Sequence, residues 1–306
     1  MRVLFAGTPA VALPSLEALR AAGHEIVAVL TRPDAPLGRK RIMTPSPVAA
    51  RAAELGLPII KADKIHAEAS AAIAAAAPEI AGIVAYGALI PPNALTIPEH
   101  GWINLHFSLL PAWRGAAPVQ HSVINGDEVT GASTFLLEKG LDTGPVYGTM
   151  TETIRPTDTS AELLERLSHS GAILLAQTID GIAAGSLAGV DQRGEISLAP
   201  KLTLEHGHVQ WTEPALAINR RIRGVTTEPG AWTMLGGQRF KLGPVRMRTD
   251  VTELAPAQLQ IEPKSVLVGT GSHAVELIDV QPAGKKLMKA TDWARGLANK
   301  EDVVFE

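Results

Sequence analysis

The chain has 306 residues, enough for one large domain or for two smaller domains that each bury a core. Hydrophobic residues make up 46% of it and charged residues 19%, as in globular proteins, and the absence of cysteine excludes disulfides, thiolate metal sites and cysteine nucleophiles. The formal net charge of −3 argues against a general nucleic-acid binder.

Charge is unevenly distributed along the chain. Residues 206–306 hold 13 Lys and Arg against 11 Asp and Glu, whereas residues 1–205 hold 15 against 20. The more basic C-terminal third permits a nucleic-acid partner without requiring one. No apolar run approaches the roughly 18 residues of a membrane span, and the apolar stretch at the start is too short for a signal peptide. We expect a cytoplasmic protein without a membrane segment, and a monomer.

The first residues predict a strand–helix–strand unit. Arg2–Gly7 is a buried-strand run, Pro14–Ala22 a helix beginning near its proline, and Glu25–Thr31 a second strand. This rhythm indicates a parallel sheet. The first turn, Gly7-Thr8-Pro9-Ala10, lacks the glycines that a dinucleotide pyrophosphate requires, which argues against an NAD-dependent dehydrogenase.

Residues 32–45 follow as a segment rich in Pro, Gly and basic side chains, without apolar periodicity. A solvated, mobile loop is the simplest interpretation. After it, helices over 46–55 and 68–77 alternate with strands over 57–60 and 80–86.

The turn after the last of these strands contains Ala85, Tyr86, Gly87, Leu89 and Ile90. Ligands of open α/β sheets bind beyond the carboxyl ends of the strands, where this turn lies. A packed loop is the alternative interpretation.

The central stretch, residues 101–147, carries the candidate catalytic residues. Strand alternation over Trp102–His106 places Asn104 and His106 on the same face. A loop around Arg114 and a strand over 133–137 lead to a second glycine-flanked loop with Asp142. An amide, an imidazole and a carboxylate are the groups that acyl-type transfer uses. On the pattern alone, ordinary polar residues and an Asx turn remain the alternative.

The rest of the chain predicts a strand over 149–154 and a long helix from Thr159 or Ser160, with Glu162 behind the cap, to about residue 184. We expect a first domain over 1–188, a linker over 189–205 and a second domain over 206–306. The second domain has short strands with glycine turns, among them Gly236-Gly237, typical of a small OB-like β-barrel. The fold class is therefore α/β: a Rossmann-like, mostly parallel sheet domain followed by that barrel. His206-x-His208 has no third ligand at useful spacing, so we expect no metal.

Three stretches resemble the signature of the 10-formyltetrahydrofolate-dependent formyltransferases: residues 104–106, 108–118 and 142–144. Residues 281–288 resemble that family's C-terminal motif, and the resemblance covers nearly the whole chain. It implies transfer of the formyl group of 10-formyltetrahydrofolate to the α-amino group of methionine on initiator tRNA. By this resemblance Asn104 stabilises the oxyanion, His106 moves the proton, and Asp142 orients His106.

The resemblance also implies a folate pocket and a tRNA contact. The expected folate-binding residues are Ala85, Tyr86, Gly87, Leu89, Ile90, Ser108, Leu109, Leu110 and Pro111. The expected tRNA-binding residues are Arg39, Lys40 and Arg41, in a loop that wedges against the acceptor stem. Two alternatives stay open: a related formyltransferase that acts on an amino sugar or hydrolyses the donor, and a non-catalytic RNA-binding protein.

Overall fold

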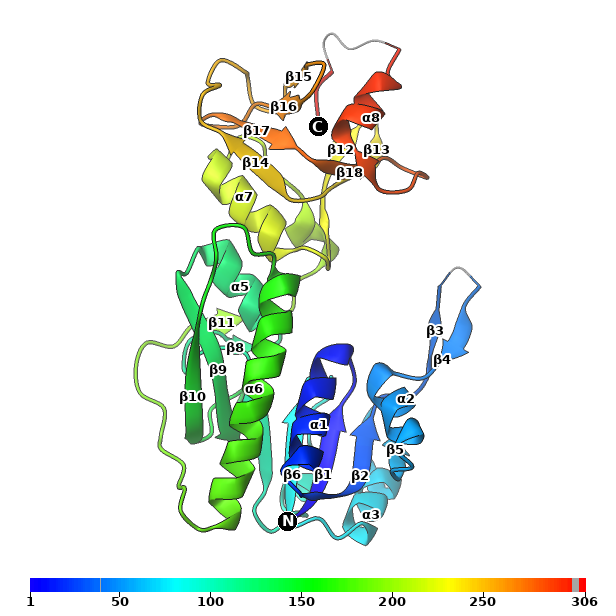
Figure 1. Cartoon of the computed structure of the whole chain (residues 1–306), viewed down its shortest axis with the longest axis vertical. Coiled ribbons are helices and arrows are strands. Elements are labelled where there is room, and N and C mark those ends of the chain that lie inside the picture. Colours follow the sequence, from blue (N-terminus) through cyan, green and yellow to red (C-terminus); the bar gives the residue numbers. More distant parts are fainter. Residues whose placement is uncertain (39, 299–302) are drawn as a thin grey trace. The chain divides into compact units, whose positions relative to one another are not determined.

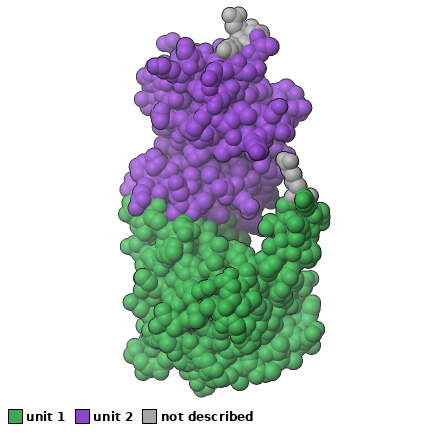
Figure 2. All heavy atoms as spheres, turned by 45° about the vertical axis from the view of Figure 1, so that its right-hand side comes forward, with its two compact units in different colours: residues 1–118, 129–153, 164–199 green, residues 119–128, 154–163, 200–306 purple. Residues whose placement is uncertain are grey.

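A computed structural model describes residues 1–38, 40–298 and 303–306. The chain forms two compact units, coloured separately in Figure 2. Unit 1 comprises residues 1–118, 129–153 and 164–199, and unit 2 comprises residues 119–128, 154–163 and 200–306. Within the described residues, no helix combines the length and apolar character that crossing a bilayer requires.

Unit 1 is built on a seven-stranded sheet with the order β10-β9-β7-β6-β1-β2-β5 (Figure 1). The strands are β1 (Arg2–Gly7), β2 (Glu25–Thr31), β5 (Ile59–Lys61), β6 (Ile80–Val84), β7 (Trp102–His106), β9 (Val129–Leu136) and β10 (Val146–Thr153). The strands from β7 to β5 pair in parallel, and β9 and β10 are antiparallel additions at one edge. β6 is buried along its whole length, as expected for a parallel strand covered on both faces. The predicted mostly parallel sheet is confirmed.

Four of the helices that begin before residue 184 start within one residue of the predicted position. The helices of this part of the chain are η1 (Ala10–Ala12), α1 (Leu13–Ala21), α2 (Pro47–Glu54), α3 (Ala67–Ala75), α4 (Pro92–Leu95), α5 (Pro118–Asn125) and α6 (Ser160–Ala183). The Ser46 side chain caps α2 by accepting from the Ala49 N–H. Thr159 and Glu162 bond reciprocally ahead of α6, which confirms the predicted cap. η1, α4 and α5 were not predicted.

The segment expected as a loop over 32–45 contains a β-hairpin, so that expectation was wrong in part. β3 (Ala35–Leu37) and β4 (Ile42–Thr44) pair antiparallel, and Figure 1 shows the hairpin projecting from the rest of unit 1. Each strand has three residues and neither face is buried, so no apolar alternation marks it in the sequence. Leu37, Ile42 and Met43 are 66%, 62% and 60% exposed.

Unit 2 contains two four-stranded antiparallel sheets, β12-β13-β18-β19 and β14-β17-β16-β15. Their strands are β12 (Ala231–Leu235), β13 (Gln238–Leu242), β14 (Val245–Arg248), β15 (Leu259–Ile261), β16 (Val266–Val268), β17 (Ala274–Leu277), β18 (Asp279–Gln281) and β19 (Met288–Lys289). The predicted Gly236-Gly237 turn joins β12 to β13, with φ angles of 57° and 69° that favour glycine.

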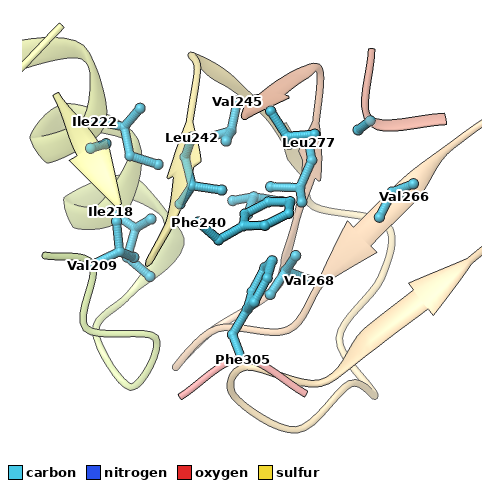
Figure 3. Close-up of a cluster of buried hydrophobic side chains, with 14 of the residues drawn as sticks. Val209, Ile218, Ile222, Phe240, Leu242, Val245, Val266, Val268, Leu277 and Phe305 are labelled. Carbon is cyan, nitrogen blue, oxygen red and sulfur yellow. The ribbon is translucent and has the colours of Figure 1, made fainter. Parts of the chain in front are cut away.

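One hydrophobic core serves both sheets of unit 2 (Figure 3). The Phe240 ring lies 4.8 Å from the Trp293 ring and 5.3 Å from the Phe305 ring, measured between centroids. The unit also contains the helices α7 (Ala215–Gly224) and α8 (Ala290–Arg295), the 3-10 helix η2 (Leu204–Gly207), most of α5 and the first residues of α6. Ile218 and Ile222 bring one face of α7 into this core.

Residues 190–199, which fall within the expected linker, are bonded inside unit 1. β11 (Leu198–Ala199) pairs in parallel with β8 (Arg114–Gly115), and Val190 forms an antiparallel bridge with Val146. We call residues 190–199 the crossing segment, because they run from the start of β10 to the loop around Arg114.

Candidate active site

The end of β7 presents the first two candidate residues. Asn104 lies opposite Phe135 of β9, and His106 lies opposite Ser133. The side chain of His106 is only 6% exposed, and the Phe135 ring meets the imidazole edge-on at 6.2 Å between centroids. The strand thus delivers both residues to the carboxyl edge of the sheet, where open α/β folds bind ligands.

The His106 ring is held between a carbonyl and a carboxylate. Its Nε2 atom lies 2.9 Å from the Trp113 carbonyl oxygen, and its Nδ1 atom lies 3.9 Å from Oδ2 of Asp142. Because a carbonyl oxygen only accepts, we assign the proton of the neutral ring to Nε2, which leaves the Nδ1 lone pair on the side of Asp142.

Burial sets the charge of this imidazole. Burial lowers the pKa of His106 below its ordinary value. The Asp142 carboxylate and the Trp113 carbonyl both raise this pKa, but by less. The net direction is downward, which favours the neutral ring, the form that can accept a proton.

The Asp142 loop is fixed by backbone groups. Oδ2 of Asp142 accepts a 2.7 Å hydrogen bond from the Gly115 N–H, and the side chain is 14% exposed. A Cβ at Gly144 would lie 1.8 Å from the carbonyl oxygen of Leu136, so only glycine fits beside this strand. The loop therefore packs directly on β9 while its carboxylate faces His106.

Asn104 keeps its amide available. The side chain is half-buried, and no other side chain or backbone group in the described residues hydrogen-bonds to it. A pre-positioned amide donor of this kind is suited to stabilise an oxyanion that develops during acyl transfer.

The turn at the end of β6 combines a buried tyrosine with several exposed residues. The Tyr86 ring is 1% exposed, and its hydroxyl donates to the Ala62 carbonyl at 2.7 Å. The Tyr86 carbonyl accepts from Thr8 Oγ1 at 2.7 Å, which ties the turn to the end of β1. Ala85, Gly87 and Leu89 are exposed, Leu89 to 87%, and Ile90 is half-buried. The turn thus exposes apolar residues at the surface, while the Tyr86 side chain packs in the core.

Residues 108–111 form a tightly bonded loop. Ser108 is fully buried, and its hydroxyl donates to the Ala112 carbonyl at 2.6 Å. Ser133 donates to the Ser108 carbonyl and accepts from the Leu110 N–H. Leu109 and Leu110 are half-buried. The Ser108 hydroxyl is thus committed to the loop itself.

Two of the three predicted tRNA-binding residues lie in the part of the chain that the structure describes. Lys40 and Arg41 are exposed between β3 and β4. Arg39 lies outside the described residues. No group of three or more His, Cys, Asp or Glu side chains that could hold a metal ion occurs among residues 1–38, 40–298 and 303–306.

Comparison with known proteins decides the family. The profile of the family described as Formyl transferase matches residues 1–179, and that of its C-terminal domain matches residues 201–298. The chain belongs to the formyltransferase family. It is 70% identical over 306 residues to the methionyl-tRNA formyltransferase of Pseudarthrobacter chlorophenolicus, and 69% identical over 306 residues to that of Arthrobacter sp. strain FB24. Both alignments cover 100% of each protein.

A solved structure shows the same fold at low identity. The N-formyltransferase from Helicobacter canadensis, in complex with folinic acid and dTDP-3-aminofucose, aligns with a TM-score of 0.69 at 15% identity. The alignment covers 92% of this chain and 99% of that one. The formyltransferase fold thus spans nearly the whole protein.

Sequence reasoning named the three side chains of this candidate site but missed several of their partners. The structure brings His106 and Asp142 together and leaves Asn104 two residues away on the same face of β7. The carbonyl of Trp113 and the N–H of Gly115 were not predicted, because backbone groups carry no residue signature. Gln192 was also missed, since it lies in a segment interpreted as a linker, and no spacing rule connects it to Asp142.

Proposed function

We propose that this formyltransferase transfers the formyl group of 10-formyltetrahydrofolate to the α-amino group of methionine on initiator tRNA, giving N-formylmethionyl-tRNA. The observation that carries the proposal is identity of 69–70% over the full length with proteins named methionyl-tRNA formyltransferase. The buried pair of His106 and Asp142, with the half-buried Asn104 on the same strand as His106, supports the chemistry.

The reaction starts from a neutral amine. Its nitrogen attacks the formyl carbon, and the formyl oxygen becomes an oxyanion in the tetrahedral intermediate. The Asn104 amide donates a hydrogen bond to that oxygen. The bond between the formyl carbon and the folate nitrogen then breaks, and the amide of formylmethionine remains.

His106 acts as the general base and then as the general acid. Its neutral ring accepts the proton of the attacking amine and returns it to the departing folate nitrogen. The Asp142 carboxylate, 3.9 Å from Nδ1, stabilises the imidazolium that forms in between. No step requires a metal ion.

Two further regions contact the substrates in this proposal. The folate ring system lies along the backbone of residues 85–90 and the loop 108–111, with Leu89 available for apolar contact. The tRNA acceptor stem meets the β3–β4 hairpin, where Arg39, Lys40 and Arg41 neutralise phosphates and the exposed Leu37, Ile42 and Met43 pack on unpaired bases. The enzyme acts as a cytoplasmic monomer.

The deciding experiment incubates the protein with 10-formyltetrahydrofolate and either methionyl-tRNA or an amino sugar nucleotide. We expect N-formylmethionine after hydrolysis of the tRNA ester and no formylated sugar. Formyl transfer to the sugar alone, or release of formate without an acceptor, would favour the related enzymes. Binding of tRNA without any formyl transfer would favour a non-catalytic RNA-binding protein.

The domain division is also a proposal. We infer that residues 1–188 and 206–306 form separate folding cores joined through 189–205. Because the crossing segment is bonded inside unit 1, we expect limited trypsin digestion to cut first after the exposed Lys201. Mass spectrometry of the fragments checks this. Cleavage confined to the chain ends would argue for one core.

A further inference from the structure

The side chain of Gln192 joins the two loops that flank His106. Its Nε2 atom donates to the carbonyl oxygens of Asp142 and Gly144, each at 2.8 Å. Its Oε1 atom accepts from Nη2 and Nε of Arg114, at 2.7 Å and 3.1 Å. All hydrogen-bonding atoms of one half-buried amide are therefore used, and every partner belongs to a loop of the site.

The two loops are the ones that position the imidazole and the carboxylate. Arg114 lies between Trp113, whose carbonyl binds His106, and Gly115, whose N–H binds Asp142. Asp142 has a φ angle of 50°, a conformation that a residue with a side chain adopts only at an energetic cost. A hydrogen bond to the carbonyl of that same residue helps to hold it there.

The crossing segment is itself anchored at both ends. Val190 exchanges two 2.8 Å backbone hydrogen bonds with Val146. At the other end, Ser197 accepts from the Trp113 N–H through its hydroxyl and from the Arg114 N–H through its carbonyl. Gln192 is thus carried by a segment that is fixed relative to both loops rather than by a free linker.

We propose that Gln192 is a positioning residue of the formyl-transfer reaction, which sets the Asp142 carboxylate at its working distance from His106. The inference rests on the proposed function for the reaction in which it acts. The charged groups of the network are the Asp142 carboxylate and the Arg114 guanidinium. The guanidinium donates its hydrogen bonds to Gln192 Oε1. Removal of the amide frees the Asp142 carbonyl and the Arg114 side chain together, so the carboxylate keeps its hydrogen bond from the Gly115 N–H but loses the support of its own backbone.

The kinetic test compares Gln192→Ala and Gln192→Glu with the wild type. Glutamate keeps the length of the side chain and an oxygen for Arg114 but cannot donate to the two carbonyls. We expect both variants to lower kcat about tenfold or more, since small displacements of catalytic groups are costly. The KM values for the formyl donor and methionyl-tRNA should stay within about twofold. Gln177→Ala is the matched control, because Gln177 is an exposed glutamine on α6 of unit 1.

A double-mutant cycle and a titration separate positioning from a structural effect. If Gln192 acts through Asp142, Gln192→Ala has little further effect on kcat in an Asp142→Asn enzyme. The pKa of His106, followed by NMR of its ring, should move in Gln192→Ala toward its value in Asp142→Asn, and stay unchanged in Gln177→Ala. Additive losses of kcat, or an unchanged pKa of His106, would overturn the proposal. Absence of methionyl-tRNA formylation by the wild type would instead overturn the proposed function, and the titration would still decide the role of Gln192.

Discussion

Replacement of Asp142 by Asn tests the chemistry of the site with almost no change in shape. An asparagine oxygen can still accept from the Gly115 N–H, so the loop should keep its conformation. What disappears is the negative charge 3.9 Å from Nδ1 of His106. For two unit charges at this distance the attraction is about 4 kcal/mol at the effective dielectric constant of about 20 that suits protein sites. A loss of about 100-fold in kcat requires about 2.7 kcal/mol, which that attraction can supply.

The pH dependence of Asp142→Asn has a definite sign. In the proposed mechanism the neutral imidazole is the active form, so we expect the rate to fall on the acid side as His106 becomes protonated. Burial already lowers the pKa of His106, and the Asp142 carboxylate opposes that effect. Without the carboxylate the pKa falls further, and the acid limb of the kcat profile moves to lower pH while its plateau drops.

Formylation of methionyl-tRNA at saturating donor, measured between pH 5 and pH 8, records both changes. Circular dichroism and thermal unfolding of the variant provide the control for folding. A profile that superimposes on that of the wild type, in height and in position, would refute the role of the charge.

Three further results are expected. Asn104→Ala should lower kcat by about 10²-fold or more through loss of the oxyanion donor, with an unchanged circular dichroism spectrum, and near-normal turnover would contradict that role. Alanine at Arg39, Lys40 or Arg41 should weaken tRNA binding, most strongly at Arg39, whereas donor hydrolysis stays constant. The slope of log affinity against log salt concentration should become shallower by about one unit for each phosphate that is no longer neutralised. Equal tRNA kinetics for variant and wild type at every salt concentration would contradict this role. Phe240→Ala should destabilise unit 2 by about 3–5 kcal/mol, because the ring is 2% exposed and packs between two aromatic rings, and an unshifted urea transition would contradict it.

Several features of this protein follow from short-range patterns. The buried residues of β1, β2 and β6 are apolar apart from Thr31, because helices cover both faces of a parallel sheet, and this pattern can be recognised in the sequence alone. Two glycines between alternating strands give the turn from β12 to β13 for an equally local reason, since both residues have positive φ.

The chemistry of the site was predictable only in part. Alternation along β7 places Asn104 and His106 on one face, and this needs no knowledge of the rest of the chain. The resemblance of the surrounding motifs named Asp142 as the third residue. Neither source could give the distance between Asp142 and His106, or show that Ser108 turns its hydroxyl into its own loop.

What the sequence by itself determined is the strands of the parallel sheet, the longer helices that cover it, and the absence of cysteine chemistry, because each depends on composition or on a local pattern. Only the tertiary structure decided how the reacting side chains are held. Trp113, whose carbonyl binds His106, has a positive φ angle of 59°, which a bulky aromatic residue does not predict. The groups that fix His106 and Asp142 are a carbonyl, an N–H and the amide of Gln192, from segments brought together by packing. Backbone groups are the same at every residue, and contacts between distant segments depend on the whole fold, so no local pattern can encode either.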